Sequence, residues 1–335
     1  MQNRYKIAIV GCSGVVGRTV LKVLEEKNFR NCTYTLFASK KSAGNKIEFL
    51  GQNYIVQELK DNSFDSKFDF AIFCAGGEVS KKFAPIASST GCIVIDNSSV
   101  FRMNENVPLV VPEVNPEKIK ENNGIIANPN CSTIQAVVAL KPLDDKYNIK
   151  RIVYSTYQAV SGAGKSGIED LENGISGIPP KKFPYPIVNN CLPHIDIFMP
   201  DGYTKEEYKM INETRKILNK PNLPITATCV RVPVRNCHSE SINVEFEKEI
   251  DIYDIKILLQ NSPGIVLVDD IENNYYPIAT KADGTDEVYV GRIRRDFSVN
   301  YGINFWVVSD NLRKGAASNA VQILEKLISW FCGFE

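Results

Sequence analysis

The chain has 335 residues, of which 44% are hydrophobic, and its 39 Lys and Arg balance 39 Asp and Glu. This balance excludes the basic excess on which nucleic-acid binding and attraction to an anionic membrane depend. Because no apolar run approaches the roughly 18–20 residues that span a bilayer, we expect a cytoplasmic enzyme-sized protein whose partner is a small molecule, with no nucleic acid and no membrane.

The N-terminal part alternates short apolar runs with amphipathic stretches, and because it opens on a strand-like run we expect no signal peptide. Strands that alternate with helices indicate an α/β fold with a doubly wound parallel sheet of the Rossmann type. The expected strands are residues 6–10, 34–38, 68–74, 92–95, 109–111 and 125–127, and the expected helices are residues 15–26 and 80–88.

The pattern changes after residue 151 to longer alternating strands, which are typical of an α+β mixed sheet. These strands are expected at residues 151–160, 225–233, 241–246, 287–296 and 298–308, and a last helix at residues 312–331. Two domains are the default at this length, because single cores stop growing near about 250–300 residues. We predict a dinucleotide-binding domain at residues 1–128, completed by a C-terminal helix at 311–335, and a catalytic and dimerisation domain at 129–310.

A glycine-rich turn follows the first strand and opens the first helix, with Gly11, Ser13, Gly14 and Gly17. Glycines there let backbone amides approach a pyrophosphate at the positive end of the helix. The spacing departs from GxGxxG, and a plain strand-to-helix turn is the alternative. The position of the turn in the first unit of the sheet favours a dinucleotide.

The end of the second strand indicates which dinucleotide is bound, because an NAD site would carry an acid there. This chain has Ser39, Lys40, Lys41 and Ser42 instead. Two lysines and two hydroxyls would accept a 2′-phosphate, so NADP is favoured over NAD; a solvated lysine turn is the alternative. A second glycine loop, at residues 75–80, is expected to line the same crevice.

Nine cysteines are scattered along the chain without a CxxC pair, and only two histidines accompany them. Neither a disulfide framework nor a structural metal site is indicated. Cys131 differs from the others because it lies between a strand and the apolar helical run 134–140, at a helix N-terminus that would stabilise a thiolate. The alternative is that its polar neighbours merely cap the helix and Cys131 fills space.

A base beside Cys131 would separate these alternatives. His238 lies in a polar interruption between two expected strands, whereas His194 lies in a loop-like segment, so we prefer His238. A nicotinamide cofactor, an activated cysteine and a histidine together imply that a thiolate adds to a carbonyl and that a hydride then moves. His238 would shuttle the proton. The sequence therefore predicts aldehyde or acyl-phosphate redox chemistry.

At these residues the chain resembles the aspartate-β-semialdehyde dehydrogenase family along nearly its whole length. Eight motifs in the same order carry the resemblance, including Asn128-Pro129-Asn130-Cys131-Ser132-Thr133. The motifs are residues 11–17, 38–44, 96–102, 111–115, 128–133, 157–164, 231–240 and 310–317. The resemblance implies reduction of L-aspartyl-4-phosphate by NADPH to aspartate semialdehyde and phosphate, on the route to lysine, threonine and methionine. It also implies a homodimer packed through the second-domain sheet, which can pair into tetramers.

The resemblance assigns roles residue by residue. Cys131 resembles the acylated nucleophile, His238 the acid/base and Gln158 the residue that orients the acyl group. Substrate contacts fall to Arg231 for the α-carboxylate, Glu206 for the ammonium, Lys209 and Arg102 for the phosphate, and to Asn130 beside the nucleophile. Cofactor contacts fall to Gly11, Ser13, Gly14, Val15, Val16, Ser39, Lys41, Ser42, Gly76, Gly77, Asn97, Ser161, Gly162 and Asn311.

Three rival functions have different expectations at the same residues. An N-acetyl-γ-glutamyl-phosphate reductase has a masked ammonium and no use for Glu206, and its cysteine follows a glycine. A glyceraldehyde-3-phosphate-type enzyme places its cysteine in a Ser-Cys-Thr-Thr context. A non-catalytic nucleotide sensor would have no reason to keep Cys131, Gln158, Arg231 and His238 together. The sequence leaves open whether Cys237, next to His238, is oxidised or cross-linked.

Overall fold

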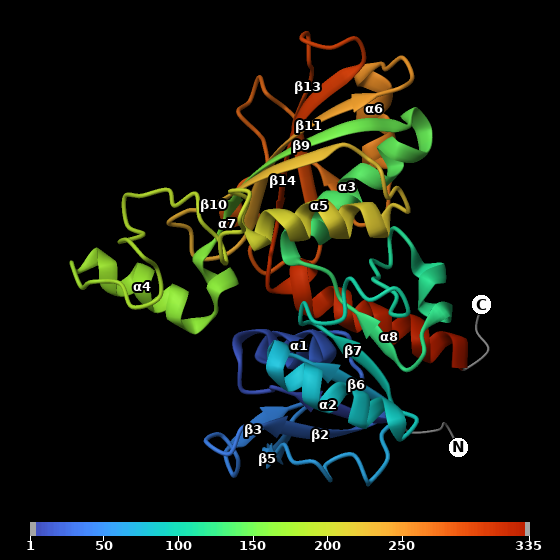
Figure 1. The fold of residues 1–335 in the computed structure, drawn as a ribbon, viewed down its shortest axis with the longest axis vertical. Helices are drawn as coiled ribbons and strands as arrows, with labels where there is room; N and C mark the ends of the chain where they lie inside the picture. Colours follow the sequence, from blue (N-terminus) through green and yellow to red (C-terminus); the bar gives the residue numbers. More distant parts are fainter. Residues whose placement is uncertain (1–4, 332–335) are drawn as a thin grey trace. The chain divides into compact units, whose positions relative to one another are not determined.

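The computed structural model describes residues 5–331, and the chain divides into two compact units. The first unit comprises residues 1–129 and 316–335, and the second unit comprises residues 130–315. Each unit has its own six-stranded sheet (Figure 1). No helix within the described residues is both long and apolar enough to cross a bilayer.

The sheet of the first unit is entirely parallel, in the order β5-β2-β1-β6-β7-β8. Its strands are β1 (Tyr5–Val10), β2 (Cys32–Ala38), β5 (Gln57–Glu58), β6 (Phe70–Phe73), β7 (Ile93–Asp96) and β8 (Ile125–Ala127). The other elements are α1 (Val15–Glu26), the hairpin of β3 (Lys46–Phe49) and β4 (Gln52–Ile55), α2 (Gly77–Ser89), a 3-10 helix (Pro116–Glu121) and α8 (Ser318–Phe331).

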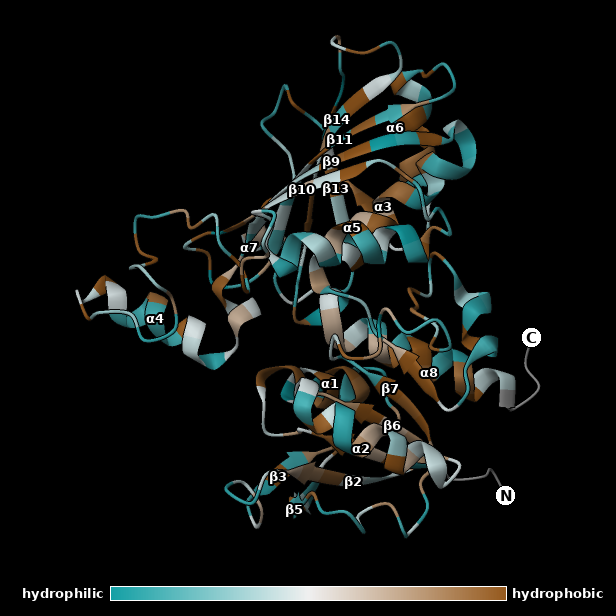
Figure 2. Ribbon diagram, in the orientation of Figure 1, coloured by the Kyte–Doolittle hydropathy of each residue, from teal (hydrophilic) through white to brown (hydrophobic). Residues whose placement is uncertain are grey.

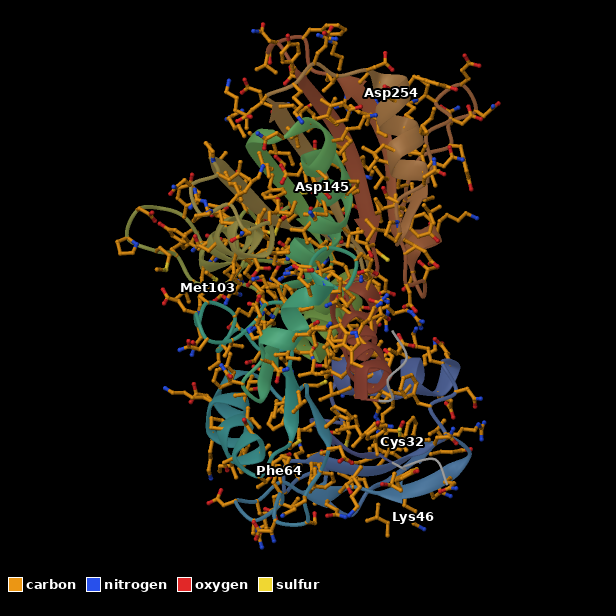
Figure 3. All side chains as sticks on the ribbon, turned by 90° about the vertical axis from the view of Figure 1, so that its right-hand side faces the viewer. Cys32, Lys46, Phe64, Met103, Asp145 and Asp254 are labelled. Atoms are coloured by element: carbon orange, nitrogen blue, oxygen red, sulfur yellow. The ribbon has the colours of Figure 1, made fainter. Side chains whose placement is uncertain are left out.

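Both faces of this sheet are buried, because successive residues of β1 enter opposite cores. Ile7 and Ile9 join the cluster that α1 and α8 complete, whereas Ala8 and Val10 join the cluster that includes Phe64. Figure 2 shows apolar residues concentrated in these strands and in α8, and Figure 3 labels Phe64. The predicted doubly wound parallel sheet is confirmed.

Two expected elements of this unit differ from the structure. Residues 109–111 form an isolated bridge from Leu109 to Ala127 instead of a strand. Proline on both sides explains this, because Pro112 has no N–H with which to continue a ladder. The last helix starts as a π-helical turn, Arg313–Ala317, before α8 begins.

The second unit has a mixed sheet in the order β10-β9-β11-β14-β13-β12, as predicted for this part of the chain. Only the two edge pairs, β10 with β9 and β12 with β13, are parallel. The strands are β9 (Ile149–Gln158), β10 (Ile225–Arg231), β11 (His238–Phe246), β12 (Ile265–Leu267), β13 (Val288–Arg295) and β14 (Gly302–Ser309). The helices are α3 (Cys131–Tyr147), a 3-10 helix (Val160–Ala163), α4 (Lys165–Ile175), α5 (Lys205–Ile217), α6 (Ile252–Gln260) and α7 (Ala279–Ala282).

Strand β11 starts earlier than residue 241, where we expected it. His238 is its first residue and pairs with Ser309 of β14. Every second residue from His238 to Phe246 is buried, while the residues between them are partly exposed. The strand therefore presents one face to the packed helices, and His238 lies on that buried face.

Candidate active site

Helix α3 begins at Cys131, and Asn130 is its N-cap. The side-chain oxygen of Asn130 accepts hydrogen bonds from the backbone N–H groups of Ser132 at 3.0 Å and Thr133 at 3.3 Å. These bonds satisfy two of the amides that a helix start leaves without an intrahelical partner. Cys131 is consequently half-buried in the first turn, where the positive end of the helix dipole stabilises a thiolate.

His238 faces Cys131, with its Nε2 atom 3.2 Å from the sulfur of that cysteine. Its other ring nitrogen, Nδ1, accepts a hydrogen bond from the backbone N–H of Ala159 at 3.0 Å. The ring is fully buried, and this burial, reinforced by the positive charge of Arg231, lowers the pKa of His238 to about 3. His238 is therefore neutral at physiological pH.

Strand ends place the other predicted side chains at the same end of the sheet. Gln158 ends β9, and Arg231 ends β10 directly opposite it in the parallel register. His238 begins β11, which runs antiparallel to β9. The buried guanidinium of Arg231 donates from Nη1 to the carbonyl oxygen of Ala159 at 2.7 Å, and so lies beside the residue that holds His238.

Glu206, in the first turn of α5, is the acidic centre of the site. Its Oε1 atom accepts hydrogen bonds from Asn130 Nδ2 at 2.9 Å and Gln158 Nε2 at 3.1 Å, and its Oε2 atom lies 2.8 Å from Lys209 Nζ. Burial would raise the pKa of Glu206, but the charge of Lys209 and these hydrogen bonds lower it to about 2. Glu206 is thus a buried carboxylate.

Lys209 has a second acidic partner that sequence reasoning missed. Asp196 Oδ2 also lies 2.8 Å from Lys209 Nζ, so the ammonium bridges two carboxylates. Burial opposes the charge on Lys209, but Glu206 and Asp196 hold the pKa of that ammonium above its usual range. Asp196 is in a loop with φ of 70°, and its sequence context gave no signal for this contact.

Two glycines lie against the candidate catalytic side chains. A Cβ atom on Gly162 would lie 2.9 Å from Arg231 Nη1 and 3.1 Å from His238 Cε1, and one on Gly315 would lie 2.9 Å from the Cβ of Cys131. Gly162 was predicted as a cofactor residue, and in the structure it lies against His238 and Arg231. Gly315 lay in a quoted motif, but nothing in the sequence singled it out.

The remaining predicted residues of the second unit, Ser161 and Asn311, contact each other. Asn311 Nδ2 donates to Ser161 Oγ at 3.0 Å, and Asn311 Oδ1 accepts from the backbone N–H of Cys237 at 2.9 Å. Cys237 is buried, and burial raises the pKa of its thiol well above the usual range. The thiol of Cys237 is therefore protonated and shielded.

The ligand-type atoms of Cys237, Asp283 and Asp310 lie within 4.8 Å of one another. Asp310 accepts backbone hydrogen bonds from Gly284 at 2.9 Å, Leu312 at 2.8 Å and Arg313 at 3.0 Å. These bonds tie together the two loops that meet at this carboxylate.

The first unit contains the glycine turn that was predicted to bind a dinucleotide. Gly11 has φ of 85°, and a Cβ atom there would lie 2.8 Å from the backbone of Cys74. A Cβ atom on Gly17 would lie 2.2 Å from the carbonyl oxygen of Gly11, so only glycine allows the helix to pack this closely on the turn. Helix α1 has Gly14 as its N-cap, without a side-chain cap, and its first amides can accept a phosphate.

A cavity of about 370 Å³ opens beside this turn. Its lining includes Gly11, Ser13, Gly14 and Ser39 together with the apolar side chains of Leu59 and Phe83. The predicted residues Val15 and Val16 open α1. Lys41 is exposed in the turn that follows β2, and Ser42 is the next residue. Gly76 has φ of 86° and caps α2, which begins at Gly77.

Asn97 and Arg102 also belong to the first unit and are engaged within it. Asn97 donates from Nδ2 to the carbonyl oxygen of Phe73 at 2.9 Å. The buried Arg102 donates to the carbonyl oxygens of Asn128 at 2.9 Å and Asn97 at 2.8 Å.

The residues brought together in the second unit are Asn130, Cys131, Gln158, Glu206, Lys209, Arg231 and His238.

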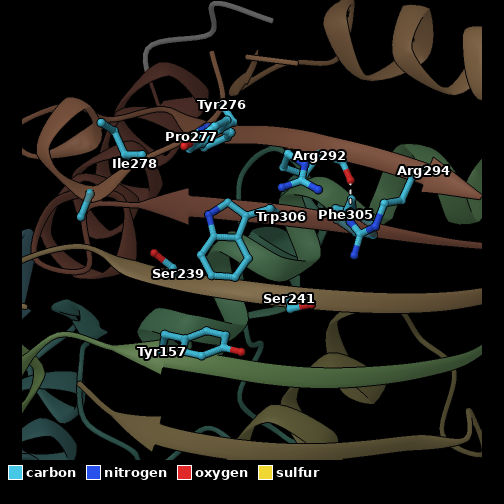
Figure 4. Close-up of a pocket in the computed structure, with 11 residues that line it drawn as sticks. Tyr157, Ser239, Ser241, Tyr276, Pro277, Ile278, Arg292, Arg294, Phe305 and Trp306 are labelled. Carbon is cyan, nitrogen blue, oxygen red and sulfur yellow. Dashed lines mark hydrogen bonds between the residues drawn. The ribbon is translucent and has the colours of Figure 1, made fainter. Parts of the chain in front are cut away.

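A separate hollow of about 460 Å³ lies on the sheet of the second unit, away from the buried face of β11 (Figure 4). Its lining comes from Tyr157, Ser239 and Trp306 on the strands and from the segment 276–279, and it includes none of the predicted catalytic residues. Tyr157, Tyr276 and Ile278 are each about two-fifths exposed there, and Arg292 and Arg294 also line the hollow, so this face combines apolar and charged side chains.

The chain matches two family models, a semialdehyde dehydrogenase NAD-binding domain over residues 6–122 and a semialdehyde dehydrogenase dimerisation domain over residues 140–314. It is 55% identical to the aspartate-semialdehyde dehydrogenase of Aquifex aeolicus, over 97% of this chain and 98% of that protein. A Vibrio cholerae aspartate-semialdehyde dehydrogenase II structure in complex with ASA has a TM-score of 0.93 and 48% identity, over 98% of this chain and 99% of that one. A Candida albicans aspartate-semialdehyde dehydrogenase with NADP has a TM-score of 0.77 and 27% identity, over 97% and 98% of the two chains.

Proposed function

The chain belongs to the aspartate-semialdehyde dehydrogenase family, and we propose that it reduces L-aspartyl-4-phosphate with NADPH to aspartate semialdehyde and phosphate, on the route to lysine, threonine and methionine. The observation that carries this proposal is the 3.2 Å contact between Cys131 Sγ and His238 Nε2 at the start of α3. A thiolate at a helix start, beside a buried histidine and a carboxylate–amide network, suits attack on an acyl carbon.

The thiolate of Cys131 would add to the acyl carbon. The bond between that carbon and the phosphate oxygen would then break, and its electron pair would leave with the phosphate. The departing phosphate takes up the one proton that the reaction consumes. When bound, NADPH would supply the hydride for reduction of the resulting thioester. The tetrahedral alkoxide formed by hydride addition would then re-form its C=O bond, return the C–S electron pair to the sulfur and release the aldehyde. Gln158, held between Thr156 and Glu206, would orient the acyl group.

Four charged side chains would bind the three charged groups of the substrate. Arg231 offers a planar fork for the α-carboxylate, and Glu206 offers the anion for the ammonium. Lys209 would meet the phosphate, as would Arg102, whose guanidinium already donates to two carbonyl groups of the first unit. Asn130 would hold Glu206 in place through the 2.9 Å hydrogen bond from its Nδ2 atom.

The first unit fits NADP on the residues that it presents. Gly11 has a positive φ, and α1 starts without a side-chain cap. The free backbone amides there could bind a pyrophosphate, and the cavity beside them would leave room for it. Ser39, Lys41 and Ser42 stand where an NAD site would need an acid. Ser161, Gly162 and Asn311 would be the contribution of the second unit to the cofactor.

A homodimer would form through the sheet of the second unit, the part that matches the dimerisation domain of the family. The hollow lined by Tyr157, Tyr276, Ile278 and two arginines, Arg292 and Arg294, would offer a face for a second copy. Such dimers could pair further into tetramers.

The deciding experiment is phosphate-dependent oxidation of aspartate semialdehyde by the reduced protein, followed as NADPH absorbance. Turnover with NADP should exceed turnover with NAD, and omission of phosphate should stop it. Folded protein that binds NADP without any turnover would be a nucleotide sensor. Preference for N-acetylglutamate semialdehyde would instead reveal the reductase of the acylated substrate.

A further inference from the structure

Arg231 is held by a segment that leaves the sheet of the second unit between β9 and α5. This excursion, residues 165–192, begins with α4, which projects to one side of the unit (Figure 1). Its last residue, Leu192, forms an isolated antiparallel bridge with Arg231, in which each backbone N–H donates to the carbonyl oxygen of the other at 2.8 Å. The end of the excursion therefore fixes the main chain of Arg231.

Phe183, from the loop of the same excursion, covers the side chain of Arg231. The guanidinium carbon lies over the Phe183 ring, 6.0 Å from its centre. The face of an aromatic ring attracts a cation at this distance, and the attraction grows where water is excluded. Arg231 is only 5% exposed and Phe183 is partly buried, so the contact is shielded from bulk water.

The guanidinium of Arg231 has few other partners. Within residues 5–331 its one hydrogen bond goes from Nη1 to the carbonyl oxygen of Ala159, at 2.7 Å. Burial lowers the pKa of Arg231, whereas Glu206, and the thiols of Cys131 and Cys229 when they are ionised, act in the opposite direction. The rest of the planar fork is available to a carboxylate, and the packing around the side chain determines where the fork points.

Asp170, on α4, holds the loop that carries Phe183. Its buried carboxylate accepts hydrogen bonds from the backbone N–H groups of Lys181 at 2.8 Å, Lys182 at 2.8 Å and Phe183 at 2.9 Å. Burial would raise the pKa of Asp170, but these three hydrogen bonds lower it, so the carboxylate is charged at neutral pH. Gly167, on the preceding turn of α4, makes room for the ring, because a Cβ atom there would lie 3.3 Å from Phe183 Cζ.

The ring of Phe183 also packs against a small buried cluster of Val160, Ile187 and Leu192. Leu192 is the residue that bridges to the main chain of Arg231. The same cluster therefore supports both contacts of the excursion with Arg231, one with its backbone and one with its side chain.

We propose that Phe183, held by Asp170, is a positioning residue for Arg231 and sets the affinity of the site for the carboxylate of the substrate. The inference rests on the proposed function, in which Arg231 binds the α-carboxylate. The ring confines the guanidinium on one face and keeps water from that face, so the fork meets the carboxylate with little reorganisation. The excursion is then a part of substrate recognition.

Phe183→Leu keeps an apolar side chain but removes the ring face. It should raise KM for aspartate semialdehyde about threefold to thirtyfold, the range of a partly to fully desolvated cation–π contact. Changes in kcat, in KM for phosphate and in NADP binding should stay below about twofold, because the contact acts on substrate binding alone. Tyr185→Ala is the matched control, since Tyr185 lies in the same loop but is 67% exposed, and it should leave every value unchanged. An unchanged KM in folded F183L, or a loss confined to kcat, would overturn the proposal.

A double-mutant cycle separates the contact with Arg231 from a general loosening of the loop. In an Arg231→Leu background the cation is already absent, so adding F183L should change kcat/KM by less than about twofold. A loss as large as in wild type would mean that Phe183 acts elsewhere, against the proposal. Asp170→Asn weakens the hold on the loop without altering the ring, and it should raise the same KM by a smaller factor. It replaces F183L as the test if F183L does not fold, and an unchanged KM would then refute the positioning role.

A measurement without substrate keeps this inference apart from the proposed function. The side-chain Nε–H signal of Arg231 in ¹⁵N-arginine-labelled protein, assigned by its loss in Arg231→Lys, should shift in F183L and stay in place in Y185A, because only F183L removes the ring over the guanidinium. An unshifted signal in F183L would overturn the contact. If the signal shifts but wild type does not turn over aspartate semialdehyde, the proposed function fails, and with it the carboxylate as the ligand, while the contact stands.

Discussion

Asn130 connects helix α3 to Glu206: its side-chain oxygen caps α3, while its Nδ2 atom donates to Glu206 Oε1 at 2.9 Å. One side chain thus sets both the helix start that carries Cys131 and the carboxylate expected to meet the substrate ammonium.

This double role of Asn130 can be separated by substitution. Asn130→Ala removes both contacts and should lower the free energy of unfolding by about 1 kcal/mol, the usual value of an N-cap. Asn130→Ser keeps a capping oxygen but cannot reach Glu206, so it should recover most of that stability. Both variants should raise KM for aspartate semialdehyde. Urea unfolding and steady-state kinetics measure the two effects, and a normal KM in N130S would argue against the positioning of Glu206.

Removal of the nucleophile should separate chemistry from cofactor binding. Cys131→Ala should abolish turnover, because no thioester can form. NADP binding, measured by fluorescence titration, should stay nearly unchanged, since the glycine turn belongs to the other unit. C237A serves as the matched control and should remain active, because the thiol of Cys237 is buried and protonated. Comparable activity in C131A would show that the nucleophile is misassigned.

Asp196 should compete with phosphate for Lys209, because its carboxylate lies 2.8 Å from the same ammonium. Asp196→Asn removes that negative charge and should lower KM for phosphate about threefold to tenfold, in line with the value of a partly buried ion pair. KM for aspartate semialdehyde should change by less than about twofold.

The control for Asp196→Asn is Asp201→Asn. Asp201 is exposed and contacts Tyr208, which lies on α5 next to Lys209. D201N should leave KM for phosphate unchanged. In a Lys209→Met background, D196N should have no further effect. A raised KM for phosphate in D196N would mean that Asp196 orients Lys209 instead of competing for it, and an unchanged value in K209M would remove Lys209 from the phosphate site.

The buried neutral ring of His238 should make folding sensitive to mild acid. Its pKa is lowered from 6.5 to about 3, so between these values the unfolded chain binds a proton that the folded chain does not. Stability from this group is therefore lost as pH falls below 6.5, by at most about 1.4 kcal/mol per pH unit. Denaturant unfolding of wild type and His238→Gln at pH 7, 6 and 5 should show a shallower decline in the variant. Parallel declines would contradict the assigned burial.

Cofactor preference should depend on the turn after β2. Lys41→Ala should lower the ratio of kcat/KM for NADP over NAD by roughly tenfold, because a hydrogen bond to a charged group contributes about 1.5–3 kcal/mol. Lys46→Ala, on the neighbouring strand β3, is the control and should leave that ratio unchanged. If K41A keeps the wild-type ratio, the 2′-phosphate is bound elsewhere.

The sequence alone was sufficient for the features that depend on neighbours along the chain. Alternation of apolar residues determines the two sheets, and the glycine spacing of residues 11–17 determines the turn before α1. The cap at Asn130 places Cys131 at a helix start, because capping is a contact between residues two and three positions apart. At His238 the polar residues nearby indicated a break, so we expected the strand to start at residue 241. It starts at His238, because that residue pairs with β14.

Only the tertiary structure decided how His238 and Lys209 work. The register that sets Gln158 opposite Arg231 also brings the N–H of Ala159, 79 positions away in the chain, to His238 Nδ1. The partner of Lys209, Asp196, comes from an irregular loop 13 positions away. Neither contact has a periodic or motif signal, because a backbone amide is present at nearly every residue and an exposed-looking Asp is common. The position of Cys131 at a helix start is thus local information, whereas the contacts of His238 depend on where the folded chain places one amide.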